Sequence, residues 1–246
     1  MSNFVTQDDL DLVENGAVRV PVVLCLDISG SMRKNDAIES LNKGIEAFYD
    51  SIKNNEQAKA SCEIAIITFA DEANLVEDFS LIDRKELKRI DYVPNGGTAL
   101  AHGVMKSLEV LDERKQKYKD TGTDYCQPWL VIITDGLPGD VEDLPAAHEE
   151  VKKRIVDKKL TLFPAVVGGD GDPEKIRSIL DELDKFSPVP GRALHIKDLH
   201  FEEFFAWLGR SASIAADAVA DVPAEGEEKK QVELDQDVSG WLGITL

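Results

Sequence analysis

Residues 19–28 read Arg-Val-Pro-Val-Val-Leu-Cys-Leu-Asp-Ile, an apolar run that does not alternate with polar residues. A strand buried on both faces needs this pattern, and such strands occur in parallel sheets that are covered by helices. Pro21 has no N–H group to donate, so it has to lie near the start of the strand. Residues 129–134 form a second buried run, Trp-Leu-Val-Ile-Ile-Thr. The chain is therefore expected to build a sheet with two buried faces.

Segments with helical spacing separate these strands. Ile38, Leu41, Ile45, Phe48 and Ile52 recur at three- and four-residue intervals and predict one apolar helix face. Further strands are predicted over residues 62–69, 74–79, 160–167 and 193–196, and further helices over residues 100–111, 143–158, after residue 173 and over residues 201–220. This alternation predicts an α/β fold with a doubly wound, mostly parallel central sheet, helices on both faces, and one short antiparallel edge strand at residues 74–79.

The composition divides the chain into four parts. One domain is expected over residues 18–220, after an N-terminal extension at residues 1–17. Residues 221–237 are rich in acidic and basic side chains and predict a linker, because such a segment has little apolar surface to bury. Residues 238–246 are apolar again and include Trp241, so we expect this last segment to dock on its own domain or on a neighbour.

Charge and cysteine content restrict the classes of function. The net charge is −19, from 47 acidic and 28 basic residues, and an acidic surface repels nucleic acid. No apolar run is long enough to span a membrane, and the polar residues 1–12 do not resemble a secretory signal. The three cysteines are an odd, sparse set that fits a reducing compartment. These features predict a cytoplasmic protein.

The first strand ends in Asp27-Ile28-Ser29-Gly30-Ser31, an Asp-x-Ser-x-Ser motif. Alternate residues of an extended segment point the same way, so the oxygens of Asp27, Ser29 and Ser31 can converge. A carboxylate and two hydroxyls are hard ligands that suit Mg²⁺, Mn²⁺ or Ca²⁺. The alternative interpretation is that Ser29 caps the following helix and Asp27 accepts hydrogen bonds from loop amides.

Two other loops carry oxygen ligands. Thr98 follows the turn at residues 95–97, and Asp135 follows the buried strand at residues 129–134. Taken singly, Thr98 could cap a helix and Asp135 could begin a turn. Together with the first motif they place two carboxylates and three hydroxyls on one edge of the sheet, which predicts a metal site made of Asp27, Ser29, Ser31, Thr98 and Asp135.

This set, in this order along the chain, resembles the metal-ion-dependent adhesion site of von Willebrand factor A (VWA) domains. Residues 19–24, 128–136 and 201–208 are similar to one branch, the bacterial cytoplasmic VWA proteins of the tellurite-resistance (TerY-like) type. The resemblance covers residues 13–213. Ala99 departs from the pattern, because this branch often has proline there, but that change removes no ligand.

The resemblance implies a non-catalytic, metal-dependent protein-binding module in a bacterial stress-response or tellurite-resistance complex. Mg²⁺ is the cation it favours, with Ca²⁺ or Mn²⁺ as alternatives, and a partner protein would donate an acidic side chain to the metal. The partner could be a kinase or phosphatase of the same system. Arg33 and Lys34 follow the serines and could hold an acidic group of the partner. His102 and Asp140 are further candidates for the rim of the site, against the alternative that both are solvated surface residues.

Three other functions are weighed against this one. A metal-dependent phosphohydrolase on a similar sheet is the main alternative, although such enzymes generally carry Asp-x-Asp and this chain has Ser29 at the second position. A nucleotide-binding protein lacks support, because no Gly-x-x-x-x-Gly-Lys-Ser/Thr loop is present. An extracellular adhesin lacks the expected signal.

Overall fold

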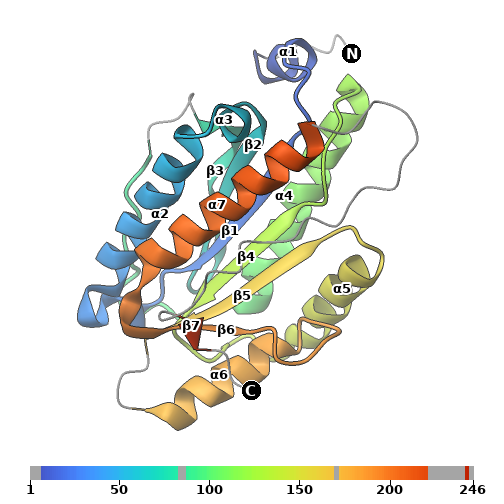
Figure 1. The fold of residues 1–246 in the computed structure, drawn as a ribbon. Coiled ribbons are helices and arrows are strands. Elements are labelled where there is room, and N and C mark those ends of the chain that lie inside the picture. Colours follow the sequence, from blue (N-terminus) through green and yellow to red (C-terminus); the bar gives the residue numbers. More distant parts are fainter. Residues whose placement is uncertain (1–6, 83–86, 169–171, 221–241, 244–246) are drawn as a thin grey trace.

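The computed structural model describes residues 7–82, 87–168, 172–220 and 242–243. Within these residues the chain forms a central sheet with helices on both faces (Figure 1). The strand order is β3-β2-β1-β4-β5-β6-β7, which places the first strand of the chain in the interior of the sheet. The predicted fold class, a doubly wound and mostly parallel sheet, is confirmed.

The strands follow the predicted segments closely. The sheet contains β1 (Val20–Asp27), β2 (Cys62–Phe69), β3 (Ala73–Leu81), β4 (Trp129–Thr134), β5 (Thr161–Val167), β6 (Leu194–Ile196) and β7 (Leu242–Gly243). β1 pairs in parallel with β2 on one side and with β4 on the other, and β5 and β6 continue the parallel order. β3 is the antiparallel edge strand, and it is nine residues long rather than short. β7 is a second antiparallel strand at the opposite edge, which the sequence analysis did not predict.

The helices form the two outer layers. They are α1 (Gln7–Glu14), α2 (Ala37–Lys53), α3 (Glu56–Ser61), α4 (Leu100–Thr121), α5 (Leu144–Val156), α6 (Pro173–Asp184) and α7 (Phe201–Ala220), with short 3₁₀ helices η1 (Gly30–Asp36) and η3 (Lys197–Leu199). Side chains of α2 and α7 pack into one apolar cluster on one face of the sheet. Side chains of α4, α5 and α6 pack into a second cluster on the other face.

β1 shows why its sequence is apolar without alternation. Val22, Leu24 and Leu26 belong to the cluster with α2 and α7, whereas Val23 and Cys25 belong to the cluster with α4. All five side chains are fully buried. Both faces of the strand therefore exclude water, which is the environment that a continuous apolar run predicts.

A buried ionic network lies at the end of the sheet opposite to the carboxyl ends of the parallel strands. Glu63 on β2 accepts hydrogen bonds from Arg114 and Tyr118 on α4. Its other oxygen lies 3.2 Å from Nε of Arg19. The Arg19 guanidinium also donates to the carbonyl oxygens of Asp11 and Asn15, so it ties α1 and the residue after it to the domain. Part of the predicted N-terminal extension is thus a helix that contacts the body of the protein.

Two residues near the C-terminus, Leu242 and Gly243, form the strand β7. Leu242 pairs with Ile196 and Gly243 with His195, which adds these two residues to the sheet. The linker predicted at residues 221–237 and the side chain of Trp241 lie outside the described residues. Their roles stay predictions.

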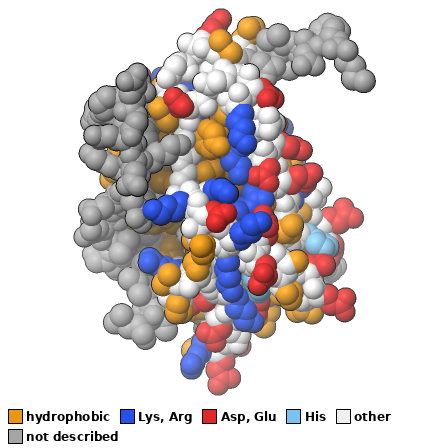
Figure 2. Space-filling model, turned by 90° about the vertical axis from the view of Figure 1, so that its right-hand side faces the viewer, with side chains coloured by type: hydrophobic (Ala, Val, Ile, Leu, Met, Phe, Trp, Pro, Cys, Tyr) orange, Lys and Arg blue, Asp and Glu red, His pale blue; other side chains and the backbone are white. Residues whose placement is uncertain are grey.

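The described surface carries both signs of charge. On the face viewed in Figure 2, basic side chains gather along the middle and acidic side chains lie beside them. Many of the cations are in ion pairs; Arg154, for example, donates to both carboxylate oxygens of Asp112. No helix among the described residues is long and apolar enough to cross a membrane.

Candidate metal centre

The loops that follow β1 and β4 meet at the carboxyl edge of the sheet. The chain leaves β1 toward β2 on one side and later returns to β4 on the other side, so the order of strands reverses between β1 and β4. Such a reversal opens a crevice at the carboxyl ends of the strands. Asp27 is the last residue of β1, and Asp135 directly follows the last residue of β4. Both carboxylates therefore lie at this crevice.

A chain of hydrogen bonds joins the two loops. The Ser31 hydroxyl donates to Oδ1 of Asp135 at 2.6 Å, and the Oγ atoms of Ser29 and Ser31 are 2.9 Å apart. Because Ser31 uses its hydrogen on Asp135, Ser29 has to be the donor in the Ser29–Ser31 bond. Ser29 Oγ then accepts no hydrogen bond from Ser31, so its lone pairs are available to a metal ion.

The carboxylate of Asp27 is fully buried and has a partner on each oxygen. Oδ1 accepts from the backbone N–H of Ser29 at 2.7 Å, and Oδ2 accepts from the hydroxyl of Thr134 at 2.6 Å. The interpretation that Asp27 accepts from a loop amide is therefore correct, and it does not exclude a metal, because each carboxylate oxygen has a second lone pair. Thr134 is a residue that the sequence analysis missed as part of the site.

The other structural interpretation of the first motif does not hold. Ser29 occupies the N-cap position of η1, but its side chain makes no capping hydrogen bond there. Its hydroxyl forms a hydrogen bond with the hydroxyl of Ser31 instead. Gly30 is needed for close packing, since a Cβ atom at this position would lie 3.0 Å from the backbone nitrogen of Asn95. The loop after β1 is thus held directly against the loop that leads to Thr98.

The loop from residue 92 to residue 98 brings Thr98 to the same edge. Three backbone hydrogen bonds fix it to the segments that follow β1 and β2: Val93 N–H donates to Ile28, Gly30 N–H donates to Gly96, and Ala99 N–H donates to Ala70. Ala99, not Thr98, is the N-cap residue of α4, so Thr98 does not serve as a cap.

Thr98 lies beside the loop that follows β4. A Cβ atom at Gly136 would lie 3.0 Å from Oγ1 of Thr98, so the glycine leaves room for this hydroxyl. The carbonyl oxygen of Thr98 also accepts from the N–H of Gly139 at 2.8 Å. Thr98 thus lies beside Gly136, the residue after Asp135. All five predicted residues therefore lie at the carboxyl edge of the sheet, Asp27 at the end of β1 and the other four on loops.

Burial works against the charge of both carboxylates. It raises the pKa of Asp27 to about 6; the Thr134 hydrogen bond opposes the rise and the nearby Asp135 charge adds to it. Burial also raises the pKa of Asp135, against the hydrogen bond from Ser31 and the positive charges of Lys175 and Lys34. A cation bound between the two carboxylates would offset this cost of burial and repulsion.

The donor set fits a hard divalent cation. It contains only oxygen atoms, from two carboxylates and three hydroxyls, and Ser31, Thr98 and Asp135 are partly open to solvent. No group of three or more His, Cys, Asp or Glu side chains within the described ranges is placed to hold a metal. The residues therefore suit Mg²⁺, Mn²⁺ or Ca²⁺.

Two residues considered for the rim have other contacts. The exposed ring of His102 lies 3.0 Å from the carboxylate of Asp143. Asp140 accepts a hydrogen bond from the backbone N–H of His102 at the start of α4. Lys175 on α6, which the sequence analysis did not single out, donates from Nζ to the backbone carbonyl of Asp135 at 2.9 Å and so ties α6 to this loop.

Residues 22–137 match the family model described as von Willebrand factor type A domain. These residues, just under half of the chain, are similar to a VWA domain. The matched range begins in β1 and ends just after Asp135, so it spans every residue of the candidate metal centre. No curated protein matches the chain.

Solved structures share the fold of this chain. The pilus adhesin SpaC from Lactobacillus rhamnosus GG is 14% identical with a TM-score of 0.62, over 80% of this chain and 31% of that one. The vWF domain of the type V pili tip protein Mfa5 from Porphyromonas gingivalis is 11% identical with a TM-score of 0.58, over 87% and 99% of the two chains. The mussel byssus proximal thread matrix protein 1, with a zinc-occupied MIDAS motif, is 15% identical with a TM-score of 0.53, over 82% and 47%. The chain spans about a third of the length of SpaC.

Proposed function

We propose that this VWA domain is a non-catalytic protein-binding module that uses a divalent cation, Mg²⁺ in the first place, to hold an acidic side chain of a partner protein. The observation that carries the proposal is the linked oxygen cluster between β1 and β4, in which Ser29, Ser31 and Asp135 are joined by hydrogen bonds. The zinc-occupied MIDAS motif in a protein of the same fold is consistent with a cation at this place.

Each residue has a distinct part in this proposal. Ser29, Ser31 and Thr98 would offer neutral hydroxyl oxygens, and Asp27 and Asp135 would offer negative charge. A bound cation supplies the positive charge that attracts an anionic ligand, and neutral ligands leave more of that charge available. Mg²⁺ takes six ligands, so a site of this size keeps positions for water or for a carboxylate from outside the chain.

Calorimetric titration of the metal-free protein with Mg²⁺, Mn²⁺ and Ca²⁺ tests the metal centre. We expect saturable binding by the wild type that is lost in Asp27→Asn and in Asp135→Asn. Lys153→Gln, an exposed change on α5, is the control and should bind as the wild type does. Saturable binding that both aspartate variants retain would place the cation elsewhere.

The complex, the partner and the cellular location are proposed on other grounds. We place the module in a bacterial stress-response or tellurite-resistance complex, with a kinase or phosphatase as a candidate partner, because of its resemblance to the TerY-like branch. The cytoplasmic location is supported by Cys25, Cys62 and Cys126, all of which are free thiols. Affinity purification from a bacterial lysate, with Mg²⁺ and then with a chelator, would identify partners whose binding depends on the metal.

No observation at the site specifically favours the alternative of a metal-dependent phosphohydrolase. The residue two positions after Asp27 is Ser29, whose hydroxyl donates to Ser31, and no second carboxylate occupies that position as a general acid. Magnesium-dependent hydrolysis of a generic phosphate ester, faster than in Ser29→Ala, would favour the enzyme.

A further inference from the structure

We propose that the hollow beside Ser31 selects the partner. It binds a glutamate side chain of the partner that lies close, in the partner's sequence, to the acidic residue directed to the metal. This inference rests on the proposed function, because it assigns a ligand class to the surface next to the same site. It concerns a protein segment with two acidic side chains, in which the first is directed to the metal and the second to Arg33 and Lys34.

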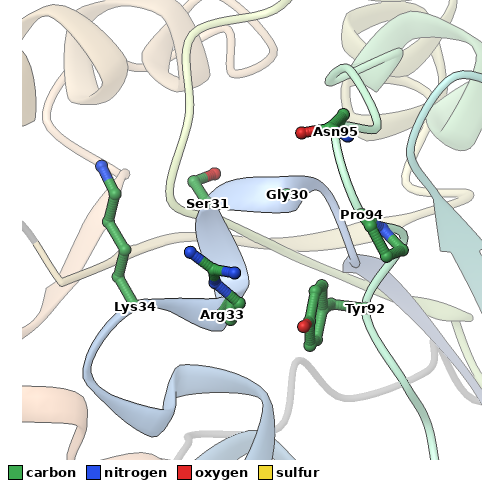
Figure 3. A pocket seen from close by; sticks show the side chains of 7 residues that line it. All are labelled: Gly30, Ser31, Arg33, Lys34, Tyr92, Pro94 and Asn95. Carbon is green, nitrogen blue, oxygen red and sulfur yellow. The ribbon is translucent and has the colours of Figure 1, made fainter.

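The hollow has a volume of about 320 Å³ and lies between two segments of the chain. Residues of η1 form one wall, and the segment from Tyr92 to Asn95 forms the other (Figure 3). The backbone N–H of Gly30 donates to the carbonyl oxygen of Gly96 at 3.2 Å, which joins the two segments. The hollow therefore has a fixed shape on loops that are anchored to β1.

Two exposed cations line this hollow, and the charge of one of them, Lys34, also acts on Asp135. The side chains of Arg33 and Lys34 are exposed, and no hydrogen bond or ion pair is described for either within the part of the chain that the structure covers. Other basic side chains, such as Arg89 and Arg154, lie against carboxylates. In a chain with net charge −19, two adjacent cations without such partners at one hollow point to an anionic ligand from outside.

Ser31 connects the hollow to the metal centre. Its side chain lines the hollow, and its hydroxyl is bonded to both Ser29 and Asp135. Residues three apart in a 3₁₀ helix lie over one another, so Lys34 is on the same side of η1 as Ser31. A short peptide can therefore reach the metal centre with one side chain and the two cations with the next.

The opposite wall indicates glutamate as the second residue. Tyr92 and Pro94 lie opposite Arg33 in Figure 3 and present apolar surface. A glutamate can lay its two methylene groups against this wall while its carboxylate reaches the guanidinium of Arg33. Arginine suits such a contact, because its planar group binds a carboxylate with two hydrogen bonds.

Binding of blocked synthetic peptides at saturating Mg²⁺ tests the inference. The probes are a glycine peptide with one glutamate and peptides with a second glutamate placed one, two or three residues later. We expect at least one two-glutamate peptide to bind the wild type about fivefold more tightly than the one-glutamate peptide, the gain of a favourable surface ion pair. Arg33→Gln/Lys34→Gln should abolish this gain, and Lys153→Gln should keep it.

The outcomes separate this inference from the proposed function. Magnesium binding and metal-dependent binding of the one-glutamate peptide, without any gain from the second glutamate, would overturn the inference alone. A gain that persists in Arg33→Gln/Lys34→Gln would also overturn it, as would a metal-loaded protein that binds no peptide. Failure of the protein to bind Mg²⁺, Mn²⁺ or Ca²⁺ would overturn the proposed function itself.

Discussion

The hydroxyl of Ser31 donates to the carboxylate of Asp135 across 2.6 Å, although the two residues are 104 positions apart in the chain. One belongs to the loop after β1 and the other to the loop after β4, and the parallel pairing of these strands brings the loops together. Two short motifs, each weak as an indication of function, thus become one cluster of oxygens. The candidate metal centre is a product of the strand order.

Thr98→Ala should weaken magnesium binding. The substitution removes one of the three hydroxyls and leaves the backbone bonds of the loop in place, so we expect the affinity to fall by about tenfold or more. Thr98→Ser keeps the hydroxyl and should bind nearly as the wild type. Calorimetry on the three proteins measures the effect, and equal affinities would remove Thr98 from the site.

Thr134→Val should destabilise the metal-free protein. The buried Asp27 carboxylate would lose the hydrogen bond to Oδ2, and an unsatisfied buried charged group costs about 2–3 kcal/mol. Urea unfolding in the presence of a chelator gives the free energy of unfolding. Thr134→Ser retains the donor and should recover most of the loss; an equally unstable Thr134→Ser would assign the effect to packing.

Glu63→Gln should be among the most damaging single substitutions. It removes the buried negative charge that the guanidinium groups of Arg19 and Arg114 contact, and breaking such a buried pair costs about 3–5 kcal/mol. The comparison is Glu39→Gln, which breaks the exposed pair with Arg89. We expect the Glu39 variant to unfold at the same urea concentration as the wild type. Similar losses in the two variants would contradict the role of burial.

The His148 side chain should make stability depend on pH. Burial against Phe186 lowers the pKa of this imidazole, and Glu182 opposes the shift only partly. The unfolded chain then binds a proton more readily than the folded one below about pH 6.5. This contribution is complete above that pH and is lost as the pH falls through the lowered folded-state pKa.

The measurement is the difference in unfolding free energy between wild type and His148→Gln across pH 7.5 to 5. We expect the wild type to lose more stability on acidification than the variant. Carboxylates common to both proteins cancel in this comparison. Parallel curves would show that His148 has the same pKa in the folded and unfolded chains.

Much of the fold could be predicted, because local pattern determined it. The run at residues 129–134 gave the bounds of β4 correctly, and the spacing from Ile38 to Ile52 gave the buried face of α2. β3 extends beyond its prediction to residues 73 and 81, both of which pair with β2. β7 has only two residues, and nothing in them indicates the pairing with β6.

The contacts within the candidate site were harder to predict from the sequence than the fold. Candidate ligands are recognisable by their residue type at strand ends. Thr134 reads as the last residue of an apolar strand, and its bond to Asp27 depends on which strands are neighbours. Lys175 reads as one charge on an amphipathic helix, and its bond to the Asp135 carbonyl depends on where α6 packs. Sequence periodicity carries no information on either contact.

The position of β4 next to β1 also has a consequence during protein synthesis. The first three oxygen ligands leave the ribosome more than 100 residues before Asp135, and β2, β3 and α4 are made in between. A nascent chain that has not yet paired β4 with β1 lacks one carboxylate and the anchor of Ser31. In the proposed function, metal-dependent binding would therefore appear only after β4 has joined the centre of the sheet.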